Sequence, residues 1–210
     1  MAVAEAAPTA ATTGDEVLAL PGESGVLELP RPRGISPLAM GLFVAGDFML
    51  LAALVCALYG LRSEAFVWPP NGVTVGTYLP TMVALTIVMS AVSMQWAVWA
   101  IGRNDQRTCL AAVGFTIFMA FAILNAQWYL LAHLNHSVSS TAYVTFVYVL
   151  TGFHMLHVIL AIVLLVVVLV RTFGGEFTQE SHDTVNAAAI FWQFANVAGL
   201  VAYSVLFLHP

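Results

Sequence analysis

Five long apolar stretches constrain this chain more than any other feature of its sequence. They cover residues 37–60, 78–101, 109–134, 142–170 and 187–208. A helix of about 20 apolar residues is long enough to cross the hydrocarbon core of a bilayer. Because backbone groups in lipid must find hydrogen-bond partners within their own segment, each stretch is predicted to be a transmembrane α-helix. The predicted fold class is therefore all-α, an integral membrane bundle of five transmembrane helices.

The low content of charged residues leads to the same class of protein. Only 8% of the 210 residues are charged and 60% are hydrophobic, whereas soluble domains carry about 25% charged residues. The chain has no basic patch with which to bind nucleic acid. We divide it into a disordered or extended tail, residues 1–35, and a transmembrane domain, residues 36–210, because the tail shows no sustained apolar periodicity.

The arginines between the spans predict an orientation in the membrane. Five of them flank one side of the bundle and one flanks the other: Arg31, Arg33, Arg103, Arg107 and Arg171 against Arg62. Short loops rich in arginine stay in the cytoplasm. We therefore expect the N-terminus inside and the C-terminus outside.

Polar side chains are few within the spans and fall at similar depths. They are Asp47, Asn125, Gln127, His154, His157, Gln193 and Asn196. With a rise of about 1.5 Å per residue, they are expected to form one polar layer close to the bilayer midplane. Asp47 is the most costly of them, because no arginine lies in any span to neutralise it. We expect it to be protonated within the bundle, or to contact His154, His157 or an adjacent chain.

Two histidines three residues apart share one face of the fourth span, within the sequence Thr151–Val158. Imidazole is a common metal ligand, so a metal or haem site is one interpretation of His154 and His157. Two histidines on one helix at this spacing cannot, however, supply opposite axial ligands to one haem. We interpret them instead as residues that hydrogen-bond between helices, with a proton-path role as a further alternative. We predict no catalytic, metal or cofactor-binding residue in the chain.

Three motifs carry a resemblance to a known family. They are Trp68-Pro69-Pro70 after the first span, Thr151–Val158 with Gly152, Phe153 and the two histidines, and the last span with Trp192 and Phe194. In this order, over about residues 36–208, they resemble subunit III of the haem–copper oxidases in its short, five-helix bacterial form. Asp47 matches an acidic position of that family.

The resemblance implies a non-redox accessory subunit in the bacterial plasma (inner) membrane. Such subunits pack beside the catalytic subunit I, together with subunit II, in a complex that reduces O2 to water coupled to proton translocation. A larger respiratory supercomplex is a further possible partner. Haem and copper are expected in the partner subunits, and family members hold phospholipid in a cleft between helices. This chain would thus have no catalytic centre of its own, although it belongs to an oxidoreductase complex.

The last span departs from the family pattern. Where family members carry a histidine, an aspartate and a tryptophan, this sequence has Gln193, Asn196 and Gly199. The amides keep hydrogen bonding but remove charge, so a structural role is expected rather than a proton-related one. Three alternatives stay open at this point: an accessory subunit of a quinol oxidase or nitric oxide reductase, a haem b membrane anchor that uses His154 or His157, and a small transporter.

Overall fold

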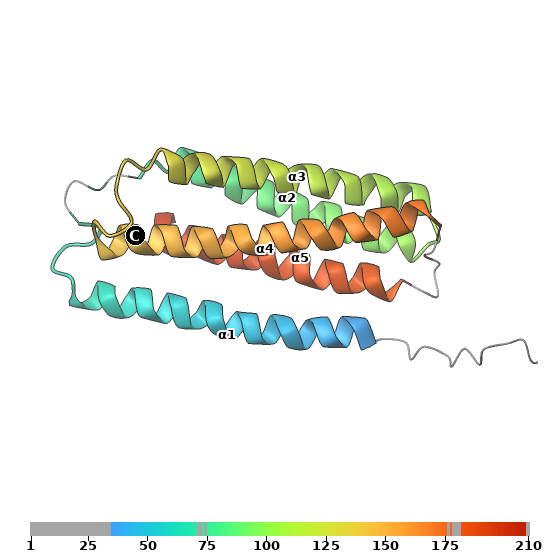
Figure 1. The fold of residues 1–210 in the computed structure, drawn as a ribbon, viewed down its shortest axis with the longest axis horizontal. Helices are drawn as coiled ribbons and strands as arrows, with labels where there is room; N and C mark the ends of the chain where they lie inside the picture. The colour runs from blue at the N-terminus through green and yellow to red at the C-terminus, as the bar shows by residue number, and fades with distance from the viewer. Residues whose placement is uncertain (1–34, 71–72, 74, 176, 178–181, 209–210) are drawn as a thin grey trace, which may run out of the picture. The chain divides into compact units, whose positions relative to one another are not determined.

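The computed structural model describes residues 35–70, 73, 75–175, 177 and 182–208, so the predicted tail lies almost wholly outside it. Within this part of the chain, five helices are long and apolar enough to cross a membrane, and no strand is present. They are α1 (Ile35–Glu64), α2 (Tyr78–Ile101), α3 (Gln106–Ala132), α4 (Ala142–Phe173) and α5 (Asp183–Tyr203), which continues into the π-helical turn η1 (Ser204–Leu208) (Figure 1). The predicted fold class is confirmed.

The ends of α2 coincide with the predicted stretch, whereas the other helices differ from theirs by a few residues. Capping side chains are present at the starts of α3 and α4. The Asp105 carboxylate accepts hydrogen bonds from the backbone N–H and the hydroxyl of Thr108, at 3.1 and 2.6 Å. This N-cap starts α3 at Gln106, three residues before the predicted span. The Thr141 hydroxyl caps α4 in the same way by accepting from the N–H of Val144, at 3.3 Å.

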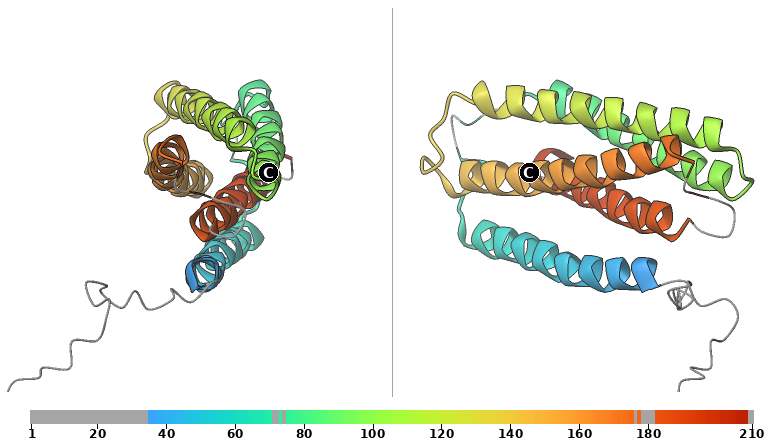
Figure 2. Two further views of the ribbon diagram at one scale, coloured as in Figure 1. Left: turned by 90° about the vertical axis from the view of Figure 1, so that its right-hand side faces the viewer. Right: turned by 45° about the vertical axis from the view of Figure 1, so that its right-hand side comes forward.

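Successive helices run in opposite directions, and α5 lies among the others (Figures 1 and 2). It packs against α1, α2 and α4, while α3 packs against α2 and α4. The buried face of α5 is rich in alanine and includes Gly199, and small side chains let neighbouring membrane helices approach closely. We call the end of the bundle with Arg103, Arg107 and Arg171 the arginine end.

Helix α1 is the least buried of the five. Only Leu51 and Leu58 of its 30 residues are buried, and it packs mainly on α5. By contrast, α4 buries twelve residues along its length. The position of α1 therefore depends on a few contacts.

The apolar core has two parts that a polar segment of α4 separates. One cluster includes Val158 and Leu165 and extends toward the arginine end, and the other includes Val147 and Leu150. Thr151, His154 and His157 lie between them and are buried. The fold thus brings polar side chains together at the junction between two apolar clusters.

Candidate functional site

The two histidines of α4 are buried but bind different helices. His154 is 1% exposed and His157 is 4% exposed. His157 faces α1, whereas His154 faces α3. Although positions three apart share one helix face, the two imidazoles do not converge on one point.

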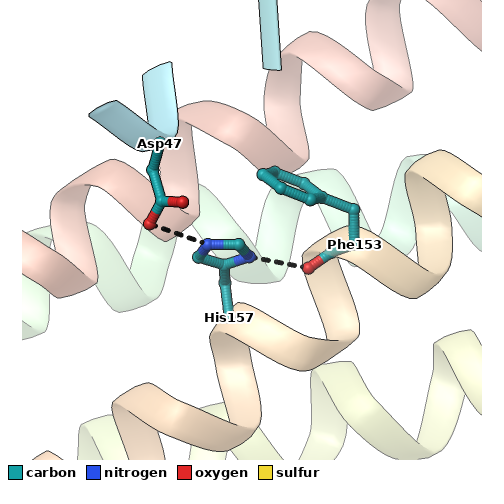
Figure 3. A network of polar contacts seen from close by, with 3 residues as sticks. All are labelled: Asp47, Phe153 and His157. Carbon is teal, nitrogen blue, oxygen red and sulfur yellow. Dashed lines mark hydrogen bonds and ion pairs between the residues drawn. The ribbon is translucent and has the colours of Figure 1, made fainter. Parts of the chain in front are cut away.

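His157 contacts Asp47, the acidic residue within α1. The Nε2 atom of His157 lies 3.1 Å from Oδ2 of Asp47, and its Nδ1 atom lies 2.8 Å from the carbonyl oxygen of Phe153 (Figure 3). Of the contacts that the sequence left open for Asp47, the structure therefore shows the one with His157. It ties the peripheral helix to the bundle.

The two contacts of His157 fix how many protons it shares with Asp47. The Phe153 carbonyl can only accept, so Nδ1 of His157 must donate a proton to it. In a neutral ring Nε2 then carries no proton, and the contact with Asp47 needs a carboxylic acid that donates to it. The alternative is a carboxylate facing an imidazolium. In either arrangement the pair shares one additional proton and has no net charge, which lowers the cost of an acid inside a membrane.

Aromatic rings surround the His157 imidazole on its inner side. The ring of Phe153 lies 4.2 Å from it, and those of Phe194 and Phe191 lie 5.6 and 5.9 Å away, between centroids. These rings fix the orientation of the imidazole and keep it toward α1.

His154 makes its contact with Gln127 of α3. The Gln127 Nε2 atom lies 2.7 Å from Nδ1 of His154, and both residues are buried. Since the amide N–H donates, Nδ1 accepts and the proton of a neutral ring is on Nε2. A neutral His154 therefore carries its ring proton on Nε2 and none on Nδ1, whereas His157 carries a proton on Nδ1 in either of its arrangements.

Gly199 of α5 makes room for the His154 ring. A Cβ atom at Gly199 would lie 2.5 Å from Nε2 of His154 and 2.8 Å from Cδ1 of Ile87. Only a glycine lets the imidazole approach the α5 backbone so closely. Gly199 is one of the positions at which this sequence departs from the pattern of the family that it resembles. The structure gives a steric reason for a glycine here.

The two amides of α5 bind α2. Asn196 Oδ1 accepts from the Ser90 hydroxyl at 3.3 Å, and the Gln193 amide donates to the carbonyl of Ala91 at 3.0 Å. The indole N–H of Trp192 also donates to the carbonyl of Ser90, at 3.4 Å. Both amides thus connect helices, as their residue type suggested.

Sequence reasoning missed the hydroxyl groups of this region. Beside Ser90, the hydroxyl of Thr116 donates to Ser93, at 3.0 Å, and that of Ser93 donates to the carbonyl of Ala112, at 3.1 Å. Two serines three residues apart in the second span were the available signal. They extend the polar contacts of α2 to both α3 and α5.

Asn125 does not face the other polar residues of the layer. Its side chain is exposed on the outer face of α3, while Gln127 is buried. Residues two positions apart on an α-helix differ in direction by about 200°, so these two amides cannot face the same side.

The remaining motif residues lie near the layer or at one end of the bundle. Trp68 meets the ring of Tyr143 edge-on, at 5.6 Å between centroids, and Trp192 and Phe194 are buried in α5. Pro69 and Pro70 belong to the connection between α1 and α2, and Gly152 belongs to α4. These residues pack the bundle, and none of them adds a reactive group to the layer.

An apolar groove runs between α1, α4 and α5 toward the arginine end. Its volume is about 450 Å³, and the side chains that line it include Met40, Phe43, Leu160, Leu164 and Phe191. The groove and the Asp47–His157 contact lie along the same junction of α1 with the bundle.

Comparison with known proteins identifies relatives of the whole transmembrane part. Residues 28–209 match the family described as cytochrome c oxidase subunit III. The cytochrome c oxidase subunit 3 of Synechocystis is 30% identical over 169 residues, which cover 80% of this chain and 72% of that protein. The subunit 3 of Thermostichus vulcanus is 27% identical over 172 residues, 81% of this chain and 86% of that protein. A probable subunit 3 of Nocardia farcinica is 27% identical over 186 residues, 87% of this chain and 91% of that protein.

Proposed function

The chain belongs to the cytochrome c oxidase subunit III family, and we propose that its part in the oxidase is structural rather than redox. It is a multi-pass bacterial membrane protein and an accessory subunit of an aerobic terminal oxidase. In this proposal it packs against the catalytic subunit I and near subunit II, which hold the haems and copper. The arginine end faces the cytoplasm, following the distribution of arginines.

The contacts of the two histidines carry this proposal. His157 uses its ring nitrogens on Asp47 and Phe153, and His154 uses Nδ1 on Gln127. Side chains held in this way join helices, and none of these contacts provides the opposed pair of ring nitrogens that a six-coordinate haem takes from two histidines. The layer therefore favours an accessory subunit over a haem b anchor.

Purification of the tagged chain from its native membrane tests the proposal. We expect haem–copper subunits to co-purify with it, and we expect the absorption of haem to remain with those subunits after the chain is separated. Purification without other oxidase subunits would contradict the accessory role. A haem absorption band on the separated chain would contradict the non-redox role.

A phospholipid is the proposed occupant of the groove between α1, α4 and α5. Its walls are almost entirely apolar side chains, such as Phe43 and Leu164, and its size suits an acyl chain. Leu164→Trp should fill the groove and reduce the lipid that remains bound after mild detergent washing, measured by mass spectrometry. Val149→Trp, on an exposed part of α4 outside the groove, is the matched control and should leave that lipid unchanged.

The outer face of α3 offers a contact for another subunit. Asn125 is six residues, about 9 Å, from the middle of α3, and so lies within the hydrocarbon core. Within the described part of the chain its amide has no hydrogen-bond partner, and the exposed rings of Phe121 and Trp128 flank it. An amide that faces lipid is costly, so we propose that a transmembrane helix of a partner subunit hydrogen-bonds it.

A cysteine cross-link tests this contact. Asn125→Cys should cross-link to another oxidase subunit in the native membrane, whereas Val163→Cys on α4, also exposed, should not. Cross-linking only between copies of this chain would show self-association instead, and no cross-link at all would leave lipid as the neighbour; either result would contradict the proposed contact.

A further inference from the structure

A small cavity lies within the bundle beside the Gln127–His154 contact. Its volume is about 30 Å³. Residues of α2, α3, α4 and the α5–η1 segment line it, among them Ile87, Gln127, Thr151, Gly199 and Tyr203. It is therefore distinct from the apolar groove at α1.

A buried polar atom without a partner belongs to a residue of the cavity wall. The Oε1 atom of Gln127 is fully buried and has no hydrogen-bond partner within the described residues. His154 Nε2 lies against Gly199, which is part of the cavity wall. Gln127 is 7% exposed. Buried polar atoms are almost always hydrogen-bonded in folded proteins.

The hydroxyl of Thr151 is a third polar group at the wall. Other helical threonines, such as Thr86 and Thr172, donate to the carbonyl oxygen four residues earlier, at 2.9 and 2.7 Å. The described residues provide no such partner for Thr151. Its hydroxyl is therefore available to a ligand in the cavity. The Tyr203 hydroxyl, which bonds Thr81 at 2.9 Å, retains a further acceptor site at the same wall.

We propose that this cavity is a binding site for one or two ordered water molecules. A buried water needs about 10–15 Å³ and two to four polar partners, and the cavity supplies both. Water donates a hydrogen bond to Gln127 Oε1 and accepts one from the Thr151 hydroxyl. It thereby joins α3 to α4 through a second contact, beside the direct bond between Gln127 and His154.

An acyl chain or a dry cavity fits these residues less well. The volume of about 30 Å³ is too small for more than a fragment of lipid. Dry cavities in proteins are lined by apolar atoms, whereas this one has an amide oxygen and a hydroxyl without other partners. The site concerns this chain alone and does not depend on the proposed accessory role.

High-resolution cryo-electron microscopy of the complete oxidase tests the site directly. We expect compact density within about 2.7–3.2 Å of Gln127 Oε1 and of the Thr151 hydroxyl. This density should persist in Thr151→Ser and disappear in Thr151→Val, which has nearly the same shape. An empty cavity in the unmodified protein, elongated lipid density, or density unchanged in Thr151→Val would overturn the proposal.

A double-mutant cycle gives a second test that does not require visible water. Gln127 and Thr151 share no direct hydrogen bond, so a water bridge predicts that their effects are coupled. The melting temperature of the complex should fall no further in Gln127→Leu with Thr151→Val than in Gln127→Leu alone. Thr116→Val removes a hydroxyl that bonds elsewhere, and its effect should add to that of Gln127→Leu. Additive effects for Thr151→Val as well would count against the bridge.

Discussion

The two sides of α4 differ in what their histidines contact, and the two residues therefore have different structural roles. His157 lies between α4 and α1, where Asp47 still has 17% of its side chain exposed. His154 lies between α3, α4 and α5 in the interior of the bundle, against Gly199 and Gln127. One imidazole thus attaches a peripheral helix, and the other belongs to the core.

This difference predicts which changes damage the fold and which only loosen one helix. Changes around His154 affect three packed helices at once, because its ring contacts residues of α3 and α5 as well as belonging to α4. Changes around His157 affect a helix that buries only Leu51 and Leu58. The following predictions run from the largest expected effect to the smallest.

Substitution of Gly199 should have the largest effect. Gly199→Ala places a Cβ atom 2.5 Å from His154 Nε2 and 2.8 Å from Ile87, and overpacking of this kind costs about 1–3 kcal/mol. We expect a lower melting temperature of the complex and loss of this subunit from it, measured by thermal scanning with subunit analysis.

Gly152→Ala is the matched control for that experiment. A Cβ at Gly152 meets no atom of the described residues within 4 Å, and alanine is favoured over glycine within a helix by about 0.5–1 kcal/mol. The control should be neutral or slightly stabilising. Equal damage from both substitutions would contradict the close packing of His154 against α5.

Removal of the Asp47 contact should have a smaller and more local effect. Asp47→Leu leaves Nε2 of His157 without its partner, and a hydrogen bond between membrane helices contributes about 0.6–2 kcal/mol. Faster proteolysis or hydrogen exchange of α1, with little change in α2 to α5, is the expected result.

Asp47→Asn distinguishes hydrogen bonding from charge at this position. The amide can donate to a neutral His157, so α1 should stay protected if the contact is a hydrogen bond. Loss of the protection of α1 in both Asp47→Leu and Asp47→Asn would show that the shared proton itself is required.

A change at Gln193 should be weaker still. Its amide is half-buried and donates to the carbonyl of Ala91, so Gln193→Leu removes one interhelical bond of about 0.6 kcal/mol. Subunit retention should fall slightly while the turnover of intact complex stays near normal. Proton pumping lost in fully assembled complex would contradict a purely structural role for this amide.

The cap of α3 should give the smallest effect, and one that depends on pH. Hydrogen bonds from the Thr108 hydroxyl and N–H lower the pKa of the Asp105 carboxyl below its ordinary value of 3.8. Because the folded pKa is depressed, the stabilisation is fully present above the ordinary value and is lost only as the pH falls through the folded pKa. The protection from hydrogen exchange that this cap gives to the first turn of α3 should therefore be constant from about pH 5 to 8. In Asp105→Asn, the protection of this turn should likewise not change with pH across that range. Protection by Asp105 that weakened near neutral pH would contradict this assignment.

Much of the fold was predictable, because hydrocarbon thickness and backbone hydrogen bonding leave few options for apolar stretches of this length. The contact of Asp47 with a histidine was one of the two outcomes that the cost of a lone acid left open, beside a protonated acid within the bundle. The choice of His157 over His154 was not predictable, since it depends on how α1 packs against α5.

The depth of a residue along a helix does not give the direction of its side chain. Asn125 and Gln127 are two residues apart, an interval that places their amides on opposite sides of α3. The role of Gly199 could not be derived from sequence, because a glycine in a helix shows its purpose only when the side chain that approaches it is known.

The different contacts of the two histidines are tested most directly by the positions of their ring protons. Solid-state NMR of the full chain in lipid, with nitrogen-labelled histidine and with His154→Gln and His157→Gln to assign the signals, reports which ring nitrogen carries a proton. The contacts predict a proton on Nε2 and none on Nδ1 for His154, and a proton on Nδ1 for His157. Protons on the same single nitrogen in both rings, or ring nitrogens bound to a metal, would contradict the account.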